Sequence, residues 1–308
     1  MILTLTLNPA VDISITTDRI IYDDRMFMDD QTAQASGKGV NIAHVLHSFG
    51  ADVESIATYG GRNGERFQRL ILETALPVRL IAVAGETRRN LNITDRQGLT
   101  LKLDERGAGL SRDELERIRG EVADRLPSVS WLTLTGSLPP GTPPDFYREI
   151  IELATKHGVK TLLDTSGDAL PVAVTANPTL AKPNLVETER LLGRSLLGEL
   201  DVFRAAEDVR KLGAQHVILS MGQKGAVAVW ENGRMRVKPP SVQTGSPIGA
   251  GDVLGAACVW ALARGESFPE AFVWGVAAAT LASSLSGLQF GTLDQVRDMK
   301  KQLEVTDG

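Results

Sequence analysis

Short β-rich stretches alternate with amphipathic helical stretches along most of the chain, and this alternation constrains the fold more than any other feature. Hydrophobic periods near 2 residues predict strands, and periods near 3.6 predict helices. Strands separated by helices form a parallel sheet covered by helices on both faces. The expected strands are 2–7, 54–59, 131–135, 159–164 and 216–220, with a hairpin over 226–238; the expected helices are 40–49, 64–75, 111–126, 144–157, 201–212, 252–263, 269–286 and 293–303.

Two regions break this alternation because they contain strand-like stretches without a helix. One covers about 11–34, and the other, about 89–103, reads as a hairpin that turns at 96–98. Both flank segments that carry candidate ligand residues. We predict that they form a small β-lid over the site, within a single domain that spans 1–308. An ordinary extension of the main sheet explains the pattern equally well.

Composition limits the class of partner. Lys and Arg total 33 against 38 acidic residues, so nothing attracts the chain as a whole to nucleic acid or to a membrane. The single cysteine, Cys258, excludes an internal disulfide and favours a reducing compartment. The N-terminus reads as a strand, and the apolar stretch 271–285 is too short to span a bilayer. We expect a cytoplasmic protein.

The sharpest motif is the segment 249–252, in which two glycines lead into a helix. Glycine lets the backbone approach a ligand closely, and the first-turn N–H groups and the helix dipole attract an anion. Asp252 at this positive end is expected to stay ionised. A carboxylate beside an anion hole suits a base that activates a hydroxyl for phosphoryl transfer. A plain glycine turn with a stabilising aspartate explains the segment about equally well.

Two familiar nucleotide motifs are absent. The spacing of Gly249, Gly251 and Gly255 has one residue too many for a dinucleotide fingerprint, and Asp252 would repel a pyrophosphate there. Gly37 and Lys38 are followed by Gly39 instead of Ser or Thr, so they do not form a Walker A loop. A dehydrogenase is therefore disfavoured.

The segment 36–43 combines glycines, Lys38 and Asn41 at the start of a helix, which suits a phosphate or a polyol. The segment 182–187 places Asn184 and Glu187 three residues apart, where their oxygens suit a partly hydrated Mg²⁺. A capping box in which Asn184 is the N-cap explains the second segment better than a metal does.

Weaker candidates follow other predicted strands or precede the lid hairpin. Taken alone, each is better explained as an ordinary turn or a solvated charge pair. They are Asp12 in 8–12, Ser137 in 136–141, Ser220 and Gly222 with Gly225, and the segment Thr87-Arg88-Arg89-Asn90.

Six of these segments, in order and over the full length, resemble the phosphofructokinase B family of carbohydrate kinases, within the ribokinase-like superfamily. They are 8–12, 37–41, 136–141, 182–187, 220–222 and 249–252. The opening Thr-Leu-Asn-Pro-Ala-x-Asp and the Gly-Lys-Gly-x-Asn segment look like the branch that acts on phosphorylated ketohexoses. That branch includes 1-phosphofructokinase, tagatose-6-phosphate kinase and the minor 6-phosphofructokinase.

The resemblance implies a ribokinase-like three-layer α/β/α fold with a mostly parallel central sheet and a small β-lid, which often pairs two copies into a homodimer. It implies that Asp252 is the catalytic base and that Gly249, Ala250 and Gly251 form the anion hole. By the same resemblance, Asp12, Gly39 and Asn41 hold the sugar, and Lys38, Arg88, Asn90 and Ser137 surround its phosphate. The implied nucleotide site comprises Lys182, Asn184, Ser220, Gly222, Gly225, Gly249 and Gly251, with Asn184 and Glu187 organising Mg²⁺ through water.

Two positions depart from the family pattern. Ser36 stands where glycine is common, and Pro247 stands where threonine is usual. Proline offers neither a backbone donor nor a hydroxyl, so the loop on the nucleotide side is in doubt. The doubled arginine also leaves open whether Arg88 or Arg89 meets a phosphate.

These observations predict an ATP-dependent kinase of a small sugar phosphate, fructose 1-phosphate or fructose 6-phosphate being the first choices and tagatose 6-phosphate a third. A kinase of a neutral sugar or nucleoside remains open, although the cations Lys38 and Arg88 would lack a partner. A non-catalytic sugar-phosphate sensor also remains open, although it would need neither Asp252 nor the pair Asn184 and Glu187.

Overall fold

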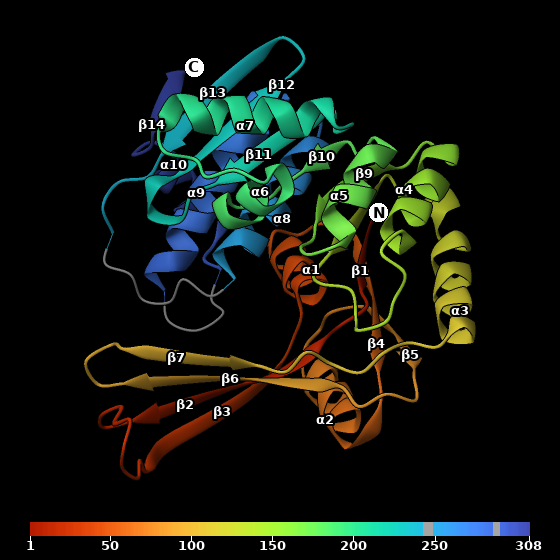
Figure 1. Cartoon of the computed structure of the whole chain (residues 1–308), viewed down its shortest axis with the longest axis vertical. Coiled ribbons are helices and arrows are strands. Elements are labelled where there is room, and N and C mark those ends of the chain that lie inside the picture. Colours follow the sequence, from red (N-terminus) through yellow and green to blue (C-terminus); the bar gives the residue numbers. More distant parts are fainter. Residues whose placement is uncertain (243–248, 286–289) are drawn as a thin grey trace.

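A ten-stranded sheet forms the body of the protein. The computed structural model describes residues 1–242, 249–285 and 290–308. In this part of the chain the strand order is β14-β13-β12-β11-β10-β9-β8-β1-β4-β5 (Figure 1). The strands from β11 to β5 in that order pair in parallel, and β12, β13 and β14 extend the sheet antiparallel. The mostly parallel sheet predicted from the sequence is confirmed.

The elements of the body follow the predicted order. Its strands are β1 (Ile2–Thr6), β4 (Val53–Tyr59), β5 (Val78–Ala82), β8 (Trp131–Thr135), β9 (Lys160–Asp164), β10 (Leu180–Ala181), β11 (His216–Ser220), β12 (Ala226–Trp230), β13 (Gly233–Lys238) and β14 (Glu304–Asp307). Its helices are α1 (Lys38–Ser48), α2 (Gly61–Leu72), α3 (Arg112–Ala123), α4 (Phe146–Lys156), α5 (Ala169–Ala173), α6 (Leu185–Leu192), α7 (Glu199–Lys211), α8 (Ala250–Ala263), α9 (Phe268–Ser284) and α10 (Leu293–Lys300).

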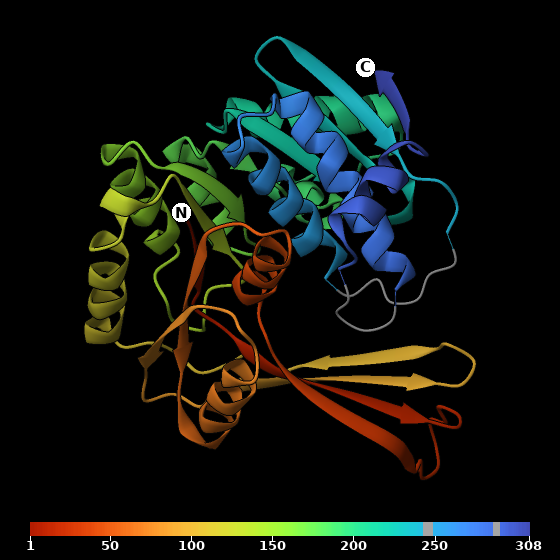
Figure 2. The same ribbon diagram turned by 180° about the vertical axis from the view of Figure 1, so that it is seen from behind.

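Alternating side chains of the strands fill two cores, one on each face of the sheet. On β1, Leu3 and Leu5 join the core that contains the buried residues of α3, α4 and α7, and on β8 Leu132 and Leu134 do the same. Trp131 points to the opposite core, which α1, α8 and α9 cover. Figures 1 and 2 show the two helical layers from opposite sides. The period of 2 along each strand thus produces the three-layer arrangement.

A second, four-stranded sheet projects from the body (Figure 1). It consists of β2 (Ala10–Thr17), β3 (Met28–Ser36), β6 (Arg88–Asp95) and β7 (Thr100–Asp104), in the order β3-β2-β6-β7. The hairpins β2–β3 and β6–β7 are antiparallel, and they join through the parallel pair β2–β6. The two irregular regions of the sequence therefore form a separate small sheet, as predicted, and not an extension of the main one. Its action as a lid remains a prediction.

Several bounds differ from the sequence expectation. The helix expected over 293–303 ends at Lys300, and the next residues form β14, which pairs with β13. All four residues of β14 are exposed, so no hydrophobic pattern in the sequence predicted that strand. The helix expected over 269–286 is described as far as Ser284, and residue 286 lies outside the described part of the chain. The elements β10 and α5 are too short for a hydrophobic period to be recognised in the sequence, so they were not predicted.

Close packing of α1 on β1 depends on Gly39, which is buried. A Cβ on Gly39 would lie 2.8 Å from the carbonyl oxygen of Leu5 and would overlap the hydroxyl of Thr6. The absence of a side chain therefore lets the start of α1 sit directly on the strand.

Replacing Gly39 by alanine should weaken this packing. We expect Gly39→Ala to lower the thermal unfolding midpoint by about 2–5 °C, since overpacking a core commonly costs about 1–3 kcal/mol. Gly120→Ala is the matched control, because Gly120 lies within α3 with open space around its Cβ position. The control should leave the midpoint unchanged or raise it slightly. Equal midpoints for the two variants would contradict the packing role of Gly39.

Candidate active site

The start of α8 carries the carboxylate at the centre of the candidate site. Gly249 adopts a left-handed conformation, with φ 78°, and caps the helix. Asp252 is the third residue of the helix and lies in its first turn, where the helix dipole favours negative charge. Its side chain is buried, with 6% of its surface exposed. Pro247, the departure noted in the sequence, lies outside the described residues.

Burial dominates the protonation of Asp252 and raises the pKa of its carboxyl to about 6. Lys38, Lys182 and a hydrogen bond from Asn41 oppose this shift, whereas Asp164 adds to it. Asn41 Nδ2 donates to Asp252 Oδ2 at 2.8 Å. The sequence argument considered only the helix dipole and missed the burial. Asp252 is still mostly ionised at neutral pH, but with a pKa close enough to 7 for proton exchange.

Two lysines share one buried carboxylate beside Asp252. Asp164, at the end of β9, lies 2.9 Å from Lys38 Nζ and 2.9 Å from Lys182 Nζ. Burial opposes ionisation of Asp164, yet the two ammonium groups outweigh it and hold the pKa of Asp164 below its ordinary value. Burial likewise disfavours the charged form of Lys38, but the carboxylates of Asp164, Asp252 and Glu187 raise its pKa above the ordinary value. The cluster thus favours the charged form of Lys38.

Sequence reasoning missed Asp164. The residue ends the strand predicted over 159–164, and ligands of parallel α/β sheets bind at the carboxyl ends of strands. That rule drew attention to the loops after other strands and could have drawn it here.

Lys182 connects the carboxylate cluster to the start of α8. A Cβ on Gly251 would lie 3.5 Å from Lys182 Nζ, so the ammonium group faces the first turn of the helix. Further along, a Cβ on Gly255 would lie 3.5 Å from Cε of Lys182. An ammonium group and a helix N-terminus therefore face the same place, which favours an anion there.

The small sheet brings three further candidates together. Asp12 and Asn90 are register partners on β2 and β6, and Asn90 Nδ2 donates to Asp12 Oδ1 at 2.8 Å. Burial raises the pKa of Asp12. Arg88 lies two residues before Asn90 and donates to the carbonyl oxygen of Asn8 at 3.2 Å. Arg89, by contrast, pairs with the exposed Glu105. Of the two adjacent arginines, Arg88 is therefore the one that lies on the same side as Asp12.

Asn8 links this group to the loop after β8. Its side-chain amide donates to Ser137 Oγ at 3.3 Å, while its backbone oxygen accepts from Arg88. A Cβ on the neighbouring Gly136 would lie 3.8 Å from Cβ of Lys38. The structure thus brings Ser137, Lys38 and Arg88 to one region.

The segment 184–187 forms the capping box that the sequence analysis gave as the alternative to a metal site. Asn184 Oδ1 accepts from the backbone N–H of Glu187, and Glu187 Oε2 accepts from that of Asn184, each at 2.9 Å. The cap leaves Glu187 Oε1 free of this exchange, and Asn184 is exposed. No group of three or more acidic, His or Cys side chains suited to a metal occurs among the described residues. The donor set fits a hydrated Mg²⁺ that is held through water, and not one held by direct ligands alone.

Ser220 lies next to Asn184, with which it forms an isolated parallel bridge. Gly222 and Gly225 have positive φ angles of 60° and 85°, which glycine adopts more readily than other residues. The turn after β11 therefore explains both glycines without a ligand. Within residues 1–242 and the other described ranges, no hydrogen bond or ion pair links these three residues to Asp252.

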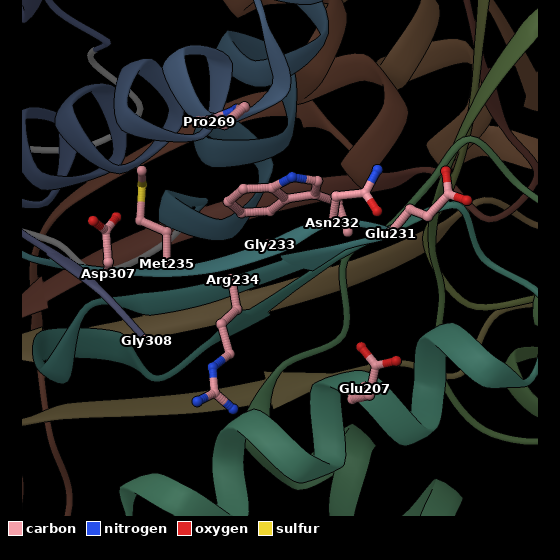
Figure 3. A pocket seen from close by; sticks show the side chains of 10 residues that line it. Glu207, Glu231, Asn232, Gly233, Arg234, Met235, Pro269, Asp307 and Gly308 are labelled. Atoms are coloured by element: carbon pink, nitrogen blue, oxygen red, sulfur yellow. The ribbon is translucent and has the colours of Figure 1, made fainter.

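The pocket in Figure 3 lies elsewhere. It has a volume of about 650 Å³ and is lined by parts of α7, β12, β13, α9 and the C-terminal residues. None of the predicted site residues lines it. A second pocket, of about 340 Å³, borders β5 and α3 and also lacks them.

The structure places a buried carboxylate, Asp252, in the first turn of α8, with the ammonium group of Lys182 facing the same helix N-terminus in an α/β fold. A family model described as pfkB family carbohydrate kinase matches residues 5–295, and the chain belongs to that family. The resemblance inferred from the motifs and the ribokinase-like fold are both confirmed. No helix in the described ranges has the length and apolar character needed to cross a membrane.

Named relatives cover nearly the whole chain. It is 31% identical to the ATP-dependent 6-phosphofructokinase isozyme 2 of Escherichia coli (strain K12), over 96% of both chains. It is 28% identical to the 1-phosphofructokinase of Vibrio cholerae, over 99% of this chain and 96% of the relative. The solved structure of phosphofructokinase-2 from Escherichia coli in complex with fructose-6-phosphate superposes with a TM-score of 0.89, at 30% identity and over 97% and 98% of the two chains.

Removing the charge of Asp164 should destabilise the protein strongly. Asp164→Asn leaves the buried ammonium group of Lys182 and the half-buried one of Lys38 without their shared counter-charge, and breaking a buried ion pair costs about 3–5 kcal/mol. We expect a fall in the thermal midpoint of about 5–8 °C. Asp145→Asn is the control, since Asp145 pairs with Arg148 on the surface and such pairs contribute about 0–1 kcal/mol. A loss no larger than that of the control would show that the cluster does not depend on Asp164.

Proposed function

We propose that the chain transfers the γ-phosphoryl group of ATP to a hydroxyl of a ketohexose phosphate, with fructose 6-phosphate or fructose 1-phosphate as substrate and fructose 1,6-bisphosphate as product. The observation that carries the proposal is the position of Asp252. It is a buried carboxylate in the first turn of α8, held by Asn41 and flanked by two charged lysines. The relatives named for 6- and 1-phosphofructokinase activity support the choice of substrates.

In the proposed reaction, Asp252 accepts the proton of the attacking hydroxyl, whose oxygen forms a bond to the γ-phosphorus as the bond to the β,γ-bridging oxygen breaks. The N–H groups of Gly249, Ala250 and Gly251 lie at the positive end of α8, where they stabilise charge on the transferred group. A base already within the first turn needs little reorganisation when the charge develops.

The sugar would lie between the small sheet and α1. Asp12 and Asn41 offer acceptors and donors for its hydroxyl groups, and the backbone of Gly39 borders the same region. Lys38, Arg88, Asn90 and Ser137 would surround the existing phosphate. Lys38 has three donors, of which Asp164 takes one, so the ammonium group can bind an anion without losing its buried partner.

The nucleotide would approach from the side of Lys182, Asn184 and Ser220, with Gly222 and Gly225 in the turn that follows, and Gly249 and Gly251 at the helix start. Asn184 and Glu187 would hold Mg²⁺ through water. When bound, Mg²⁺ supplies positive charge to the phosphates of the nucleotide. Lys182, held by Asp164 against the start of α8, keeps its own charge close to the same phosphates.

The small sheet would act as a lid and as the contact of a homodimer. Large apolar side chains are exposed on it or on the turns that connect its strands. They are Ile21, Tyr22, Met26, Phe27, Met28, Leu99 and Leu103. Closing the sheet over the sugar would exclude water, which would otherwise compete as the phosphoryl acceptor.

A substrate panel tests the proposal. With Mg-ATP, we expect ADP release with fructose 6-phosphate, fructose 1-phosphate or tagatose 6-phosphate, at a kcat/KM at least about 10²-fold above that with fructose, ribose or adenosine, because the neutral compounds leave Lys38 and Arg88 unpaired. Better turnover of a neutral sugar would overturn the sugar-phosphate assignment. Folded protein that binds ATP but turns over none of them would favour the sensor.

The pH profile tests the base. Since Asp252 must be ionised to accept a proton, we expect kcat/KM to be level above pH about 6 and to fall about tenfold per unit below it. Asp252→Asn should lower kcat by about 10²–10⁴-fold, with little change in KM, and should remove this acid limb. Asp145→Asn on the surface is the control. An acid limb that persists in Asp252→Asn would assign it to another group.

A further inference from the structure

Asn8 joins the loop after β1 to three other segments of the chain through its own hydrogen bonds. Its side-chain amide donates to the backbone oxygen of Arg106 at 3.1 Å and to Ser137 Oγ at 3.3 Å. Its backbone oxygen accepts from Nε of Arg88 at 3.2 Å. The residue is buried, with 9% of its surface exposed. Asn8 therefore contacts two residues that the proposed function places around the phosphate of the sugar.

The amide of Asn8 determines which way the hydroxyl of Ser137 can donate. An amide side chain has two N–H hydrogens, and Asn8 uses one on Arg106 and the other on Ser137. The second bond occupies a lone pair of Ser137 Oγ, so the hydroxyl hydrogen must point to a different acceptor. Within the described residues, no hydrogen bond has Ser137 as the side-chain donor. The hydrogen is thus available for an acceptor such as a phosphate oxygen.

Backbone oxygens orient the guanidinium group of Arg88 in a similar way. Nε donates to Asn8, and Nη1 donates to the backbone oxygen of Glu105 at 3.1 Å. A guanidinium group has five N–H donors in a rigid fork, so Nη2 and the second hydrogen of Nη1 remain for an anion. Because both carbonyl acceptors are neutral, they orient the group without neutralising its charge. Arg89, by contrast, pairs with the carboxylate of Glu105.

The chain encloses the amide of Asn8 and leaves it one favourable orientation. A Cβ on Gly107 would overlap Asn8 Oδ1, so the chain passes directly over the amide oxygen. If the amide were turned over, this oxygen would face the backbone oxygen of Arg106, and the bond between them would be lost. The observed orientation is the one in which both N–H hydrogens have acceptors.

We propose that Asn8 is a positioning residue that sets the preference of the site for a phosphorylated sugar over a neutral one. It directs the hydroxyl hydrogen of Ser137 and the outer N–H groups of Arg88 toward the phosphate. The proposal rests on the proposed function, in which Ser137 and Arg88 surround that phosphate. Asn8 acts through these two residues and takes no part in the chemical step. A neutral sugar has no phosphate oxygens to accept from them, so its binding does not depend on Asn8.

Asn8→Ala should weaken binding of the sugar phosphate and leave the chemistry intact. For the ketohexose phosphate with the highest turnover, we expect KM to rise about 5–30-fold, with kcat and the KM for ATP changed less than about twofold. The kcat/KM for fructose should stay within about twofold, so the preference for the phosphorylated substrate falls. An unchanged preference would overturn the proposal. If Asn8→Ala does not fold, Asn8→Ser replaces it, because the shorter side chain cannot reach both Arg106 and Ser137.

Asn8→Asp separates the direction of the hydrogen bond from the shape of the side chain. The carboxylate has nearly the same shape as the amide, but it accepts where the amide donates. The hydroxyl hydrogen of Ser137 would turn to it and away from the phosphate, which the added negative charge also repels. We expect a KM for the sugar phosphate at least about fivefold above that of Asn8→Ala. A KM at or below that of Asn8→Ala would contradict the assigned direction.

A double-variant cycle tests the path through Ser137. In a Ser137→Ala background, Asn8→Ala should raise KM by less than about threefold, since the hydroxyl that it orients is gone. Full additivity of the two losses would contradict this path.

Thr58→Val is the matched control for loosening of the loop. Thr58 is buried, and its Oγ1 donates to the backbone oxygen of Leu7, next to Asn8, at 3.0 Å. Thr58→Val and Asn8→Ala each remove a buried hydrogen bond of this loop, so both should lower the thermal midpoint by about 2–5 °C. Only Asn8→Ala should change the substrate preference. An equal change in Thr58→Val would assign the effect to the loop and overturn the role of the Asn8 amide.

Binding measurements separate this proposal from the proposed function. Fructose 6-phosphate and fructose 1-phosphate are titrated by calorimetry, without ATP, into the wild type, Asn8→Ala and Thr58→Val. Binding that is weakened only in Asn8→Ala, in a wild type that turns neither compound over, would refute the proposed function and keep the role of Asn8. Turnover with the same affinity and KM in Asn8→Ala would refute that role and keep the function. A wild type that binds neither compound would overturn both.

Discussion

The carboxylate of Asp164 is the constraint on which the site depends. It lies at the end of β9, fully buried, and it neutralises one lysine from α1 and another from the loop after β10. Two ammonium groups so close together would repel each other without it, and a buried charge without a partner is strongly destabilising. The strand order places β9 beside β10 in the sheet, so the fold itself brings the three charges together.

The same cluster sets the protonation of Asp252. Burial alone would hold the carboxyl neutral, and Lys38 and Lys182 restore part of its acidity, so that its pKa of about 6 is a balance between these effects. A base with a pKa far below this value would accept a proton poorly, and one far above it would be protonated at neutral pH. In the proposed reaction the lysines therefore serve two purposes: they attract the anionic ligands and they favour the ionised form of Asp252.

Local patterns predicted the parts of this structure that depend on neighbours in sequence. The period of 2 predicted β1 and β8, the glycines predicted the start of α8, and the spacing of Asn184 and Glu187 predicted a cap, which the structure contains. The ion-pair cluster around Asp164 was not predicted, because it depends on Lys38, which lies 126 residues away in the sequence. Strand β14 was not predicted because its four residues are exposed and form no apolar face. Backbone pairing with β13 alone defines the strand. The buried hydrogen bond between Asn41 and Asp252 joins residues 211 apart, and no local period encodes it.

The departure at Ser36 has a different meaning once the small sheet is placed. In the sequence it stood only as a departure from the glycine that is common at this position. In the structure it ends β3, opposite Ala10 and near Asp12, immediately before the turn that starts α1. Its hydroxyl donates to Asn41 Oδ1 on α1, and the amide of Asn41 donates in turn to Asp252 on α8. Since Ser36, Asn41 and Asp252 are all buried, solvent competes little for these two hydrogen bonds, which hold the amide of Asn41 against the carboxylate of Asp252.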